Sequence, residues 1–308
     1  MSRIAVVLAG SLLLMAVLIV LLRRSTDPVT QSNPTGETPS ATKPPLMIFC
    51  AASNRAVMEK TVEDYASEFG RQVDIQFGPS QTLLSQMEVS AVGDLYLPAD
   101  DSFLEMAREK QLVEEVLPIA QMKGVIAVKK GNPLSIKKFD DLLKEEIRLV
   151  QADPDAAAIG KVTRRILQKT NQWEKLKVAT AAFRTTVNEA ANDVVVGAAD
   201  AAIVYDAVLH TYPDLEFIEI SELEPSNSQI SVGVIRSSDR GMDALHFARY
   251  LSARDRGLKR YEEFGFRVSG GDAWSDVPQL KLFAGSMLRP AIEDTIKARS
   301  EEHTSELQ

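Results

Sequence analysis

The feature that most constrains the fold is an alternation of short apolar and amphipathic segments that starts at Leu46. "LMIFCAAS" (46–53) is an apolar run ending in small residues, and residues 55–70 follow with apolar positions spaced for a helix. Residues 72–78 and 93–100 are further strand-like segments, each followed by a helical one. Strands joined by single helices form right-handed crossovers and lie parallel. The pattern therefore predicts an α/β fold with mainly parallel sheets flanked by helices.

The alternation starts afresh after residue 124, where "GVIAVKKGNP" begins a second set of strand and helix units. "ALHFARYLSARDRGLKRYEEFGF" (244–266) has the apolar stripe of a helix pair. Gly70 stands where the first helix should end, and we expect it to be the C-cap residue. The chain from 46 to 268 is thus long enough for two α/β units.

Three strand-to-helix turns carry hydroxyl or small side chains: "AAS" (51–53), "GPSQT" (78–82) and "DPDAAAIG" (153–160). Ligands of open α/β sheets bind beyond the carboxyl ends of strands, where such turns lie. Small residues let backbone N–H groups approach a ligand, and a helix N-terminus favours an anion. Each turn alone fits an ordinary N-cap or turn. Their combination favours an anion-binding site.

Composition argues against several other functions. The net charge is −8, whereas a nucleic-acid partner would require a basic face. A serine nucleophile needs a positioned base, and neither His210 nor His246 stands in a catalytic-type turn. With one cysteine and three scattered histidines, a His/Cys metal site has almost no ligands. We expect no enzyme activity, no catalytic residue, no metal and no cofactor.

The N-terminus carries a different signal. Residues 4–22 form an uncharged apolar run of membrane-spanning length, flanked by Arg3 and by Arg23–Arg24. Neither an Ala-x-Ala cleavage site nor a lipobox cysteine follows. Residues 1–24 are therefore expected to be a transmembrane anchor, with a cleaved signal segment as the alternative. Residues 25–45 are rich in Pro, Ser and Thr and predict a linker.

Several stretches between Met47 and Val268 together resemble the molybdate-binding proteins of bacterial ABC importers, which have the type II periplasmic-binding-protein fold. The resemblance implies two lobes, the first of about 46–124 and 232–268 and the second of about 125–231. It also implies a periplasmic or extracytoplasmic location and delivery of the ligand to an ABC permease. The stretches that carry it, in matching order and spacing, are "IFCAASNRAVMEK", "FGPSQTLLSQMEVSAVGDLYLPAD", "ADPDAAAIGKVTRRILQKTNQWEKL", "TTVNEAANDVVVGAADAAIVYDA" and "RYEEFGF".

The same resemblance implies a site for molybdate or tungstate, bound as an oxyanion by neutral donors between the lobes. Ser53 and Ser80 would supply hydroxyl and backbone N–H groups from the first lobe. In the second lobe, Ile159 and Val187 would each supply a backbone N–H, and Tyr205 its phenol.

The chain departs from the family pattern at three places. Pro79 removes an N–H beside Ser80, Ile159 is bulkier than usual, and Asn188 stands where arginine is frequent. These departures keep the anion class and leave open the choice among molybdate, tungstate and sulfate-like ions. Within the binding proteins, a receptor for sulfate, phosphate or ferric ion is the alternative. The predicted anchor also leaves open a sensor module at the membrane surface.

The C-terminal part predicts a second, incomplete unit. Residues 269–279 have the composition of a linker, and "LKLFAGSMLRPAIEDTIK" (280–297) matches the first strand, turn and helix at an offset of 234. We expect residues 280–298 to be the start of a second similar domain. The final "RSEEHTSELQ" (299–308) is polar, lacks helical periodicity and resembles a translated sequencing adapter.

Overall fold

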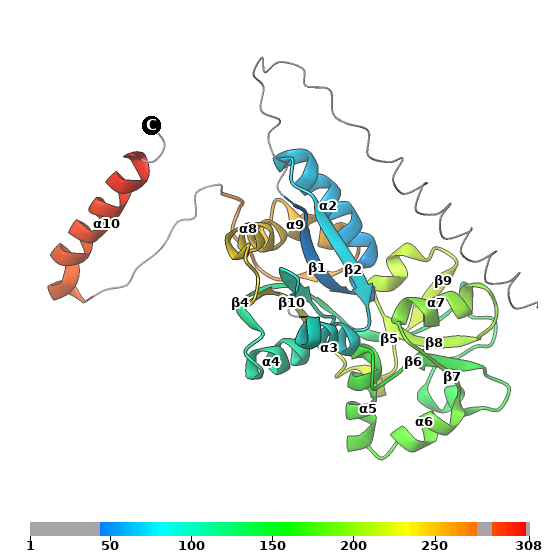
Figure 1. Cartoon of the computed structure of the whole chain (residues 1–308). Coiled ribbons are helices and arrows are strands. Elements are labelled where there is room, and N and C mark those ends of the chain that lie inside the picture. Colours follow the sequence, from blue (N-terminus) through cyan, green and yellow to red (C-terminus); the bar gives the residue numbers. More distant parts are fainter. Residues whose placement is uncertain (1–43, 91, 276–284, 306–308) are drawn as a thin grey trace, which may run out of the picture. The chain divides into compact units, whose positions relative to one another are not determined.

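The computed structural model describes residues 44–90, 92–275 and 285–305 (Figure 1). The predicted anchor (4–22), nearly all of the predicted linker (25–45) and the strand expected at 280–284 lie outside these residues. Within the described ranges, no helix combines the length and the apolar character that a membrane span requires.

The first sheet has six strands in the order β11-β4-β10-β3-β1-β2. β1 pairs in parallel with both β2 and β3. The strands of this sheet are β1 (Leu46–Ala51), β2 (Val73–Gly78), β3 (Leu95–Leu97), β4 (Val113–Met122), β10 (Ser228–Ile235) and β11 (Arg267–Val268). The helices of the same lobe are η1 (Ala52–Asn54), α2 (Arg55–Phe69), α3 (Ser80–Ser90), α4 (Ser102–Glu109), α8 (Gly241–Ser252) and α9 (Gly257–Glu263).

The second sheet has five strands in the order β7-β6-β8-β5-β9. β6, the second strand in this order, is parallel to its neighbours β7 and β8. The strands are β5 (Gly124–Lys129), β6 (Leu149–Ala152), β7 (Thr180–Arg184), β8 (Ala201–Tyr205) and β9 (Leu215–Ile218). The helices of this lobe are η2 (Phe139–Leu143), α5 (Ala158–Lys169), α6 (Trp173–Ala179), α7 (Val187–Val195), η3 (Ala207–Thr211) and η4 (Ser221–Leu223).

Both sheets are mixed, so the prediction of mainly parallel sheets is wrong for part of each. β10 is antiparallel to β3 and β4, and β5 is antiparallel to β8 and β9. Only Lys123 separates β4 from β5, so the chain passes between the sheets there without a helix. The rule that makes crossover strands parallel applies only when a connection returns to the same sheet. The second passage lies before Ser228, slightly earlier than the expected boundary at 232.

The helix α2 shows why the local pattern was readable. Its buried positions, Val57, Met58, Thr61 and Tyr65, recur at helical spacing and form one face. Gly70 has a φ of 64° and donates its N–H to the carbonyl of Ala66. The predicted C-cap is therefore confirmed, since only glycine adopts this conformation without a Cβ penalty.

The site follows from where helices begin. β1, β2, β6 and β7 are followed by η1, α3, α5 and α7, respectively. Each of these helices therefore begins beyond the carboxyl end of a strand, which is the position that α/β folds use for ligands. The crossing connections leave both sheets in one folded unit, and Figure 1 shows β2 and α3 of the first lobe beside the second lobe.

The C-terminal helix α10 (Arg289–Ser305) follows the short η5 (Ser286–Leu288). The predicted helix over this region is confirmed, but it does not stop near residue 298. Glu and Arg are good helix formers, which compensates for the absence of an apolar stripe beyond that point. Met287, Leu288 and Ile296 are exposed.

Candidate functional site

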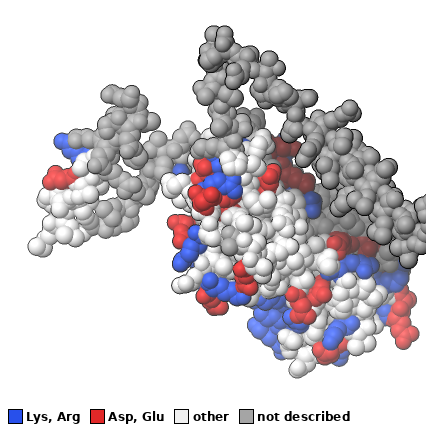
Figure 2. All heavy atoms as spheres, viewed as in Figure 1, with Lys and Arg blue, Asp and Glu red and all other residues white. Residues whose placement is uncertain are grey.

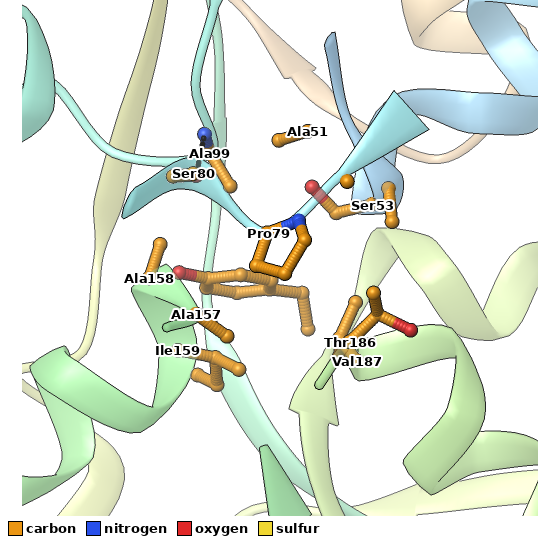
Figure 3. A pocket seen from close by; sticks show the side chains of 13 residues that line it. Ala51, Ser53, Pro79, Ser80, Ala99, Ala157, Ala158, Ile159, Thr186 and Val187 are labelled. Atoms are coloured by element: carbon orange, nitrogen blue, oxygen red, sulfur yellow. Dashed lines mark hydrogen bonds between the residues drawn. The ribbon is translucent and has the colours of Figure 1, made fainter. Parts of the chain in front are cut away.

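A single small pocket collects all five residues that the sequence placed in the site. It holds about 20 Å³, so it admits only a small ligand. None of its lining residues is charged. These residues, shown in Figure 3, are Ala51, Ala52, Ser53, Gly78, Pro79, Ser80, Ala99, Ala157, Ala158, Ile159, Thr186, Val187 and Tyr205.

Ser80 is the first residue of α3 and is fixed from two sides. Its hydroxyl oxygen accepts a hydrogen bond from the Ala99 N–H at 3.1 Å, and its carbonyl accepts one from the Tyr96 phenol at 2.8 Å. The side chain is buried, with 2% of the residue exposed. Because a backbone N–H already occupies a lone pair of the hydroxyl oxygen, the hydroxyl proton is free to be donated into the pocket.

Ser53, in η1, has the same arrangement built from side chains. The Tyr261 phenol donates to Asn54 Oδ1 at 3.2 Å, and Asn54 Nδ2 donates to Ser53 Oγ at 3.4 Å. Asn54 and Tyr261 are fully buried. The Asn54 amide thus occupies a lone pair of the Ser53 oxygen, and the Ser53 hydroxyl proton is also available for donation into the pocket.

The start of α5 supplies backbone donors. The N-cap residue is Ala157, whose side chain cannot cap, and the first helical hydrogen bond runs from Lys161 N–H to the Ala157 carbonyl. The N–H groups of Ala158, Ile159 and Gly160 precede that bond and therefore have no partner within the helix. A Cβ at Gly160 would collide with the carbonyl oxygen of Ala152, so glycine permits the close approach of α5 to β6. Alanine is a poor N-cap, and this end of α5 suits an anion.

The start of α7 is capped only in part. Thr186 Oγ1 accepts the Glu189 N–H at 3.2 Å, and the Glu189 carboxylate accepts from Thr185 and Thr186. This capping box satisfies the third N–H of the helix. The N–H groups of Val187 and Asn188 come earlier and have no intrahelical acceptor. Val187 lines the pocket, and its role as a backbone donor stays a prediction.

Tyr205 ends β8 and lines the pocket. Its hydroxyl lies 3.1 Å from Ser228 Oγ, and only 1% of the residue is exposed. Burial raises the pKa of Tyr205 strongly, and the charge of Asp100 raises this pKa further. The phenol is therefore neutral at physiological pH and can donate a hydrogen bond.

The two lobes touch directly at the edge of the pocket. Gln81 N–H, in the first turn of α3, donates to the carbonyl of Ala156 at 3.1 Å. Ala156 immediately precedes the N-cap of α5. The bond holds the two helix starts close together, which is required if one ligand is to contact both.

Several residues that support the site were not identified from the sequence. Ala99, Ser228 and Tyr261 reach the predicted residues or their neighbours from 19, 23 and 207 positions away, and no local pattern reveals such contacts. Asn54 lies next to Ser53 in the chain, but its role depends on the distant Tyr261. Thr186 is different, because the "TVNE" signature of a capping box was available to find it.

The histidines lie elsewhere. His246 packs with Tyr65 and Trp274, and His210 packs against Phe264. Neither lines the pocket, so among the side chains that the structure describes no imidazole lies beside Ser53 and Ser80. In the part of the chain that the structure describes, no cluster of three or more His, Cys, Asp or Glu side chains could hold a metal ion. On the face shown in Figure 2, acidic and basic side chains are interspersed.

The chemistry of the pocket is that of neutral donors converging on a small volume. Two hydroxyls, a phenol and the N-termini of α5 and α7 present hydrogen-bond donors from different directions. A tetrahedral oxyanion has oxygen acceptors pointing in all directions and suits such a set. A simple cation, which has no acceptor atoms, would leave these donors unused.

Comparisons with known proteins identify the family of the chain. The family model of the bacterial extracellular solute-binding proteins matches residues 46–267. The molybdate-binding protein ModA of Mycobacterium tuberculosis is 28% identical over 238 residues, which cover 76% of this chain and 88% of that protein.

Two solved structures show the same fold. The Azotobacter vinelandii periplasmic molybdate-binding protein matches with a TM-score of 0.63 at 17% identity, covering 73% of this chain and all of that one (100%). The sulfate-binding protein SubI of Mycobacterium tuberculosis matches with a TM-score of 0.62 at 15% identity, covering 72% and 86%.

Proposed function

The chain belongs to the bacterial extracellular solute-binding proteins, and on this basis we propose that it captures molybdate or tungstate outside the cytoplasm and delivers it to an ABC permease. Ser53, Ser80, Ile159, Val187 and Tyr205 are the proposed ligand-binding residues. The proposal is supported by relatives named as molybdate-binding proteins and by the donors of the pocket.

One observation carries the proposal more than any other. Both serine oxygens already accept a hydrogen bond from the protein, Ser80 from Ala99 and Ser53 from Asn54. Each hydroxyl is therefore oriented to donate into the pocket, where no charged side chain is present to accept. An anion with several oxygen acceptors satisfies these donors, and a neutral apolar ligand would leave them unpaired at a cost.

The energy of such a site is sufficient without a positive side chain. A hydrogen bond to a charged ligand contributes about 1.5–3 kcal/mol, so roughly six donors give a gross term of about 10 kcal/mol or more. Closing the lobes and desolvating the ion reduce that gain. A micromolar to nanomolar affinity corresponds to about 8–12 kcal/mol. Nearly all donors must therefore be engaged, which favours an ion that fits the pocket.

Sulfate is the second candidate, because a sulfate-binding protein shares the fold. Sulfate and molybdate are both tetrahedral dianions, and they differ in size. Pro79 has no N–H and so lowers the number of donors at the site. The bulky side chain of Ile159 reduces the volume that is left for the ligand. We favour the larger ions because the named relatives bind molybdate.

The proposed location is the extracytoplasmic side of the membrane, with residues 4–22 as the anchor or as a cleaved signal. Residues 280–298 are proposed to begin a second similar domain.

Calorimetric titration of the full chain, kept in mild detergent, tests the function. We expect molybdate and tungstate each to bind with a measurable heat and a stoichiometry of one. Sulfate and phosphate should bind more weakly. A protein that remains folded by circular dichroism and binds none of the four ions would refute the proposal. Tighter binding of sulfate than of molybdate would transfer it to the second candidate.

A further inference from the structure

The helix α5 contacts the first lobe at a second place, away from its pocket-lining end. Lys161 extends from the first turns of α5 to α4, where its Nζ lies 4.4 Å from the centroid of the Phe103 ring. The same Nζ lies 3.8 Å from Met106 Sδ. Phe103 is buried, with 1% of the residue exposed. An ammonium group of one lobe therefore rests on a ring of the other.

The contact is not an ion pair. Among the residues that the structure describes, no carboxylate lies within ion-pair distance of Lys161. Asp100 and Glu105 act on it only at longer range, as do Arg164 and Arg165 with the opposite sign. Burial lowers the pKa of Lys161, and the Asp100 charge opposes this lowering. A partly desolvated ammonium over an aromatic face is attracted more strongly than an exposed one.

The position of Lys161 links this contact to the pocket. Lys161 lies one helical turn after Ala157, and its N–H makes the first hydrogen bond of α5. On the same side, Gln81 N–H bonds to the Ala156 carbonyl. In the first lobe, Phe103 N–H donates to the Asp100 carbonyl, directly after the pocket residue Ala99. The N-terminus of α5 is thus held against the first lobe at two points.

We propose that Lys161 is a positioning residue for ligand binding, which holds the donor end of α5 over the first-lobe serines through Phe103 and Met106. The inference rests on the proposed function, because it deepens the account of the same pocket. Lys161 does not touch the ligand. It sets the fraction of ligand-free molecules in which both walls of the pocket are in place. The apparent affinity falls in proportion when this fraction falls.

Replacing the ammonium tests the inference. Lys161→Met keeps the apolar stem and the helix propensity while removing the charge. We expect the dissociation constant for molybdate to rise about three- to thirtyfold, the range of a partly buried ammonium–ring contact. Because fewer ligand-free molecules would be competent to bind, most of the change should be in the apparent association rate. The matched control is Lys169→Met, an exposed position on the same helix, which should bind like the wild type.

A double-mutant cycle with Phe103→Leu assigns the effect to the contact. If the ring is the partner, Lys161→Met in the Phe103→Leu background should cost little further affinity. Equal affinity of Lys161→Met and wild type would overturn the inference. Full additivity of the two losses would overturn it as well.

A ligand-free measurement separates this inference from the proposed function. Small-angle scattering of the ligand-free variants should show a larger radius of gyration for Lys161→Met than for Lys169→Met. If the wild type binds no oxyanion, the proposed function fails. The scattering comparison still tests Lys161 in that case, because equal radii of gyration of the two variants would overturn its interlobe role.

Discussion

The two walls of the pocket present the same kind of group by different means. The first-lobe wall uses hydroxyls, Ser53 and Ser80, each held from behind by a hydrogen bond. The second-lobe wall uses mainly backbone N–H groups at the starts of α5 and α7, and the hydroxyls of Tyr205 and Thr186 are its side-chain donors. The first wall is specified by side-chain identity, and the second by where two helices begin.

The difference determines how each wall responds to substitution. Truncating a serine removes a donor directly, because the donor is the side chain. Truncating an apolar residue at the start of α5 or α7 leaves the N–H in place. Only proline removes a backbone donor, and the first turn of a helix tolerates it. The following predictions use this contrast, from the largest effect to the smallest.

Removing both hydroxyls of the first wall should have the largest effect. Ser53→Ala and Ser80→Ala each delete one charge-assisted hydrogen bond, and we expect each to weaken molybdate binding by about 1.5 kcal/mol, close to tenfold. The double variant should lose about 3 kcal/mol, or more than 100-fold. Calorimetric titration measures the loss.

The control for this pair is Ser90→Ala, at the exposed end of α3, where the hydroxyl bonds only to the carbonyl of Gln86. It should bind molybdate like the wild type. Unchanged affinity in the double variant would show that the first wall does not contact the ligand.

The second wall is tested by Val187→Pro. Val187 is the first residue of α7, and its predecessor Thr186 is extended, with φ −129° and ψ 158°, as a residue before proline should be. The substitution should remove one donor with little change to the helix and weaken binding by about 2 kcal/mol.

Val187→Ala is the matched variant, because it loses more side-chain volume and keeps the N–H. Its affinity should stay within about threefold of the wild type. Equal losses in the two variants would mean that the Val187 side chain matters and its backbone does not.

The same contrast explains what could be predicted from the sequence. The turns that hold Ser53, Ser80 and Ile159 were readable because small residues and hydroxyls at strand-to-helix turns form a pattern along the chain, whereas Val187 and Tyr205 were implied only by the family resemblance. The helix bounds followed from apolar spacing and from Gly70. The five residues predicted for the site all line one pocket.

The features that could not be predicted from the sequence depend on residues that are far apart in the chain. The relay from Tyr261 to Ser53 joins residues more than 200 positions apart, and the strand directions of β5 and β10 depend on where the chain changes sheet. Local periodicity reports which face of an element is buried and not which strand lies beside it. Backbone donors are likewise invisible in side-chain identity.

Tyr205 is a side-chain donor of the second wall, and removing its hydroxyl should have a smaller effect. Its hydroxyl is shared with Ser228 Oγ, so Tyr205→Phe should weaken binding by about 1 kcal/mol, roughly fivefold. Ser228→Ala should cost less, because the phenol remains. A larger loss in Ser228→Ala than in Tyr205→Phe would assign the donor to the serine.

The pH dependence checks the same residue. Because burial raises the pKa of Tyr205, the phenol should stay protonated, and the affinity for molybdate should not fall between pH 7 and pH 9 on its account. A decline over this range that is absent in Tyr205→Phe would contradict the assignment.

Asp101 affects the stability of the first lobe and lies outside the pocket. Asp101, at the start of α4, accepts from Ser231 Oγ through Oδ2, while its Oδ1 is buried and has no hydrogen-bond partner. Burial raises the pKa of Asp101 to about 6. Since this pKa is higher in the folded than in the unfolded chain, the carboxyl favours folding most below pH 4, and this contribution is lost as the pH rises through 6.

Asp101→Asn should therefore increase the free energy of unfolding at pH 7 by roughly 0.5–1 kcal/mol, a value reduced for the partial exposure of the group. At pH 4 the variant and the wild type should unfold at nearly the same urea concentration. Molybdate affinity should not change, because Asp101 does not line the pocket. A variant that is less stable than the wild type at pH 7 would show that the charge of Asp101 supports the first lobe, and the unpaired oxygen would then need another explanation.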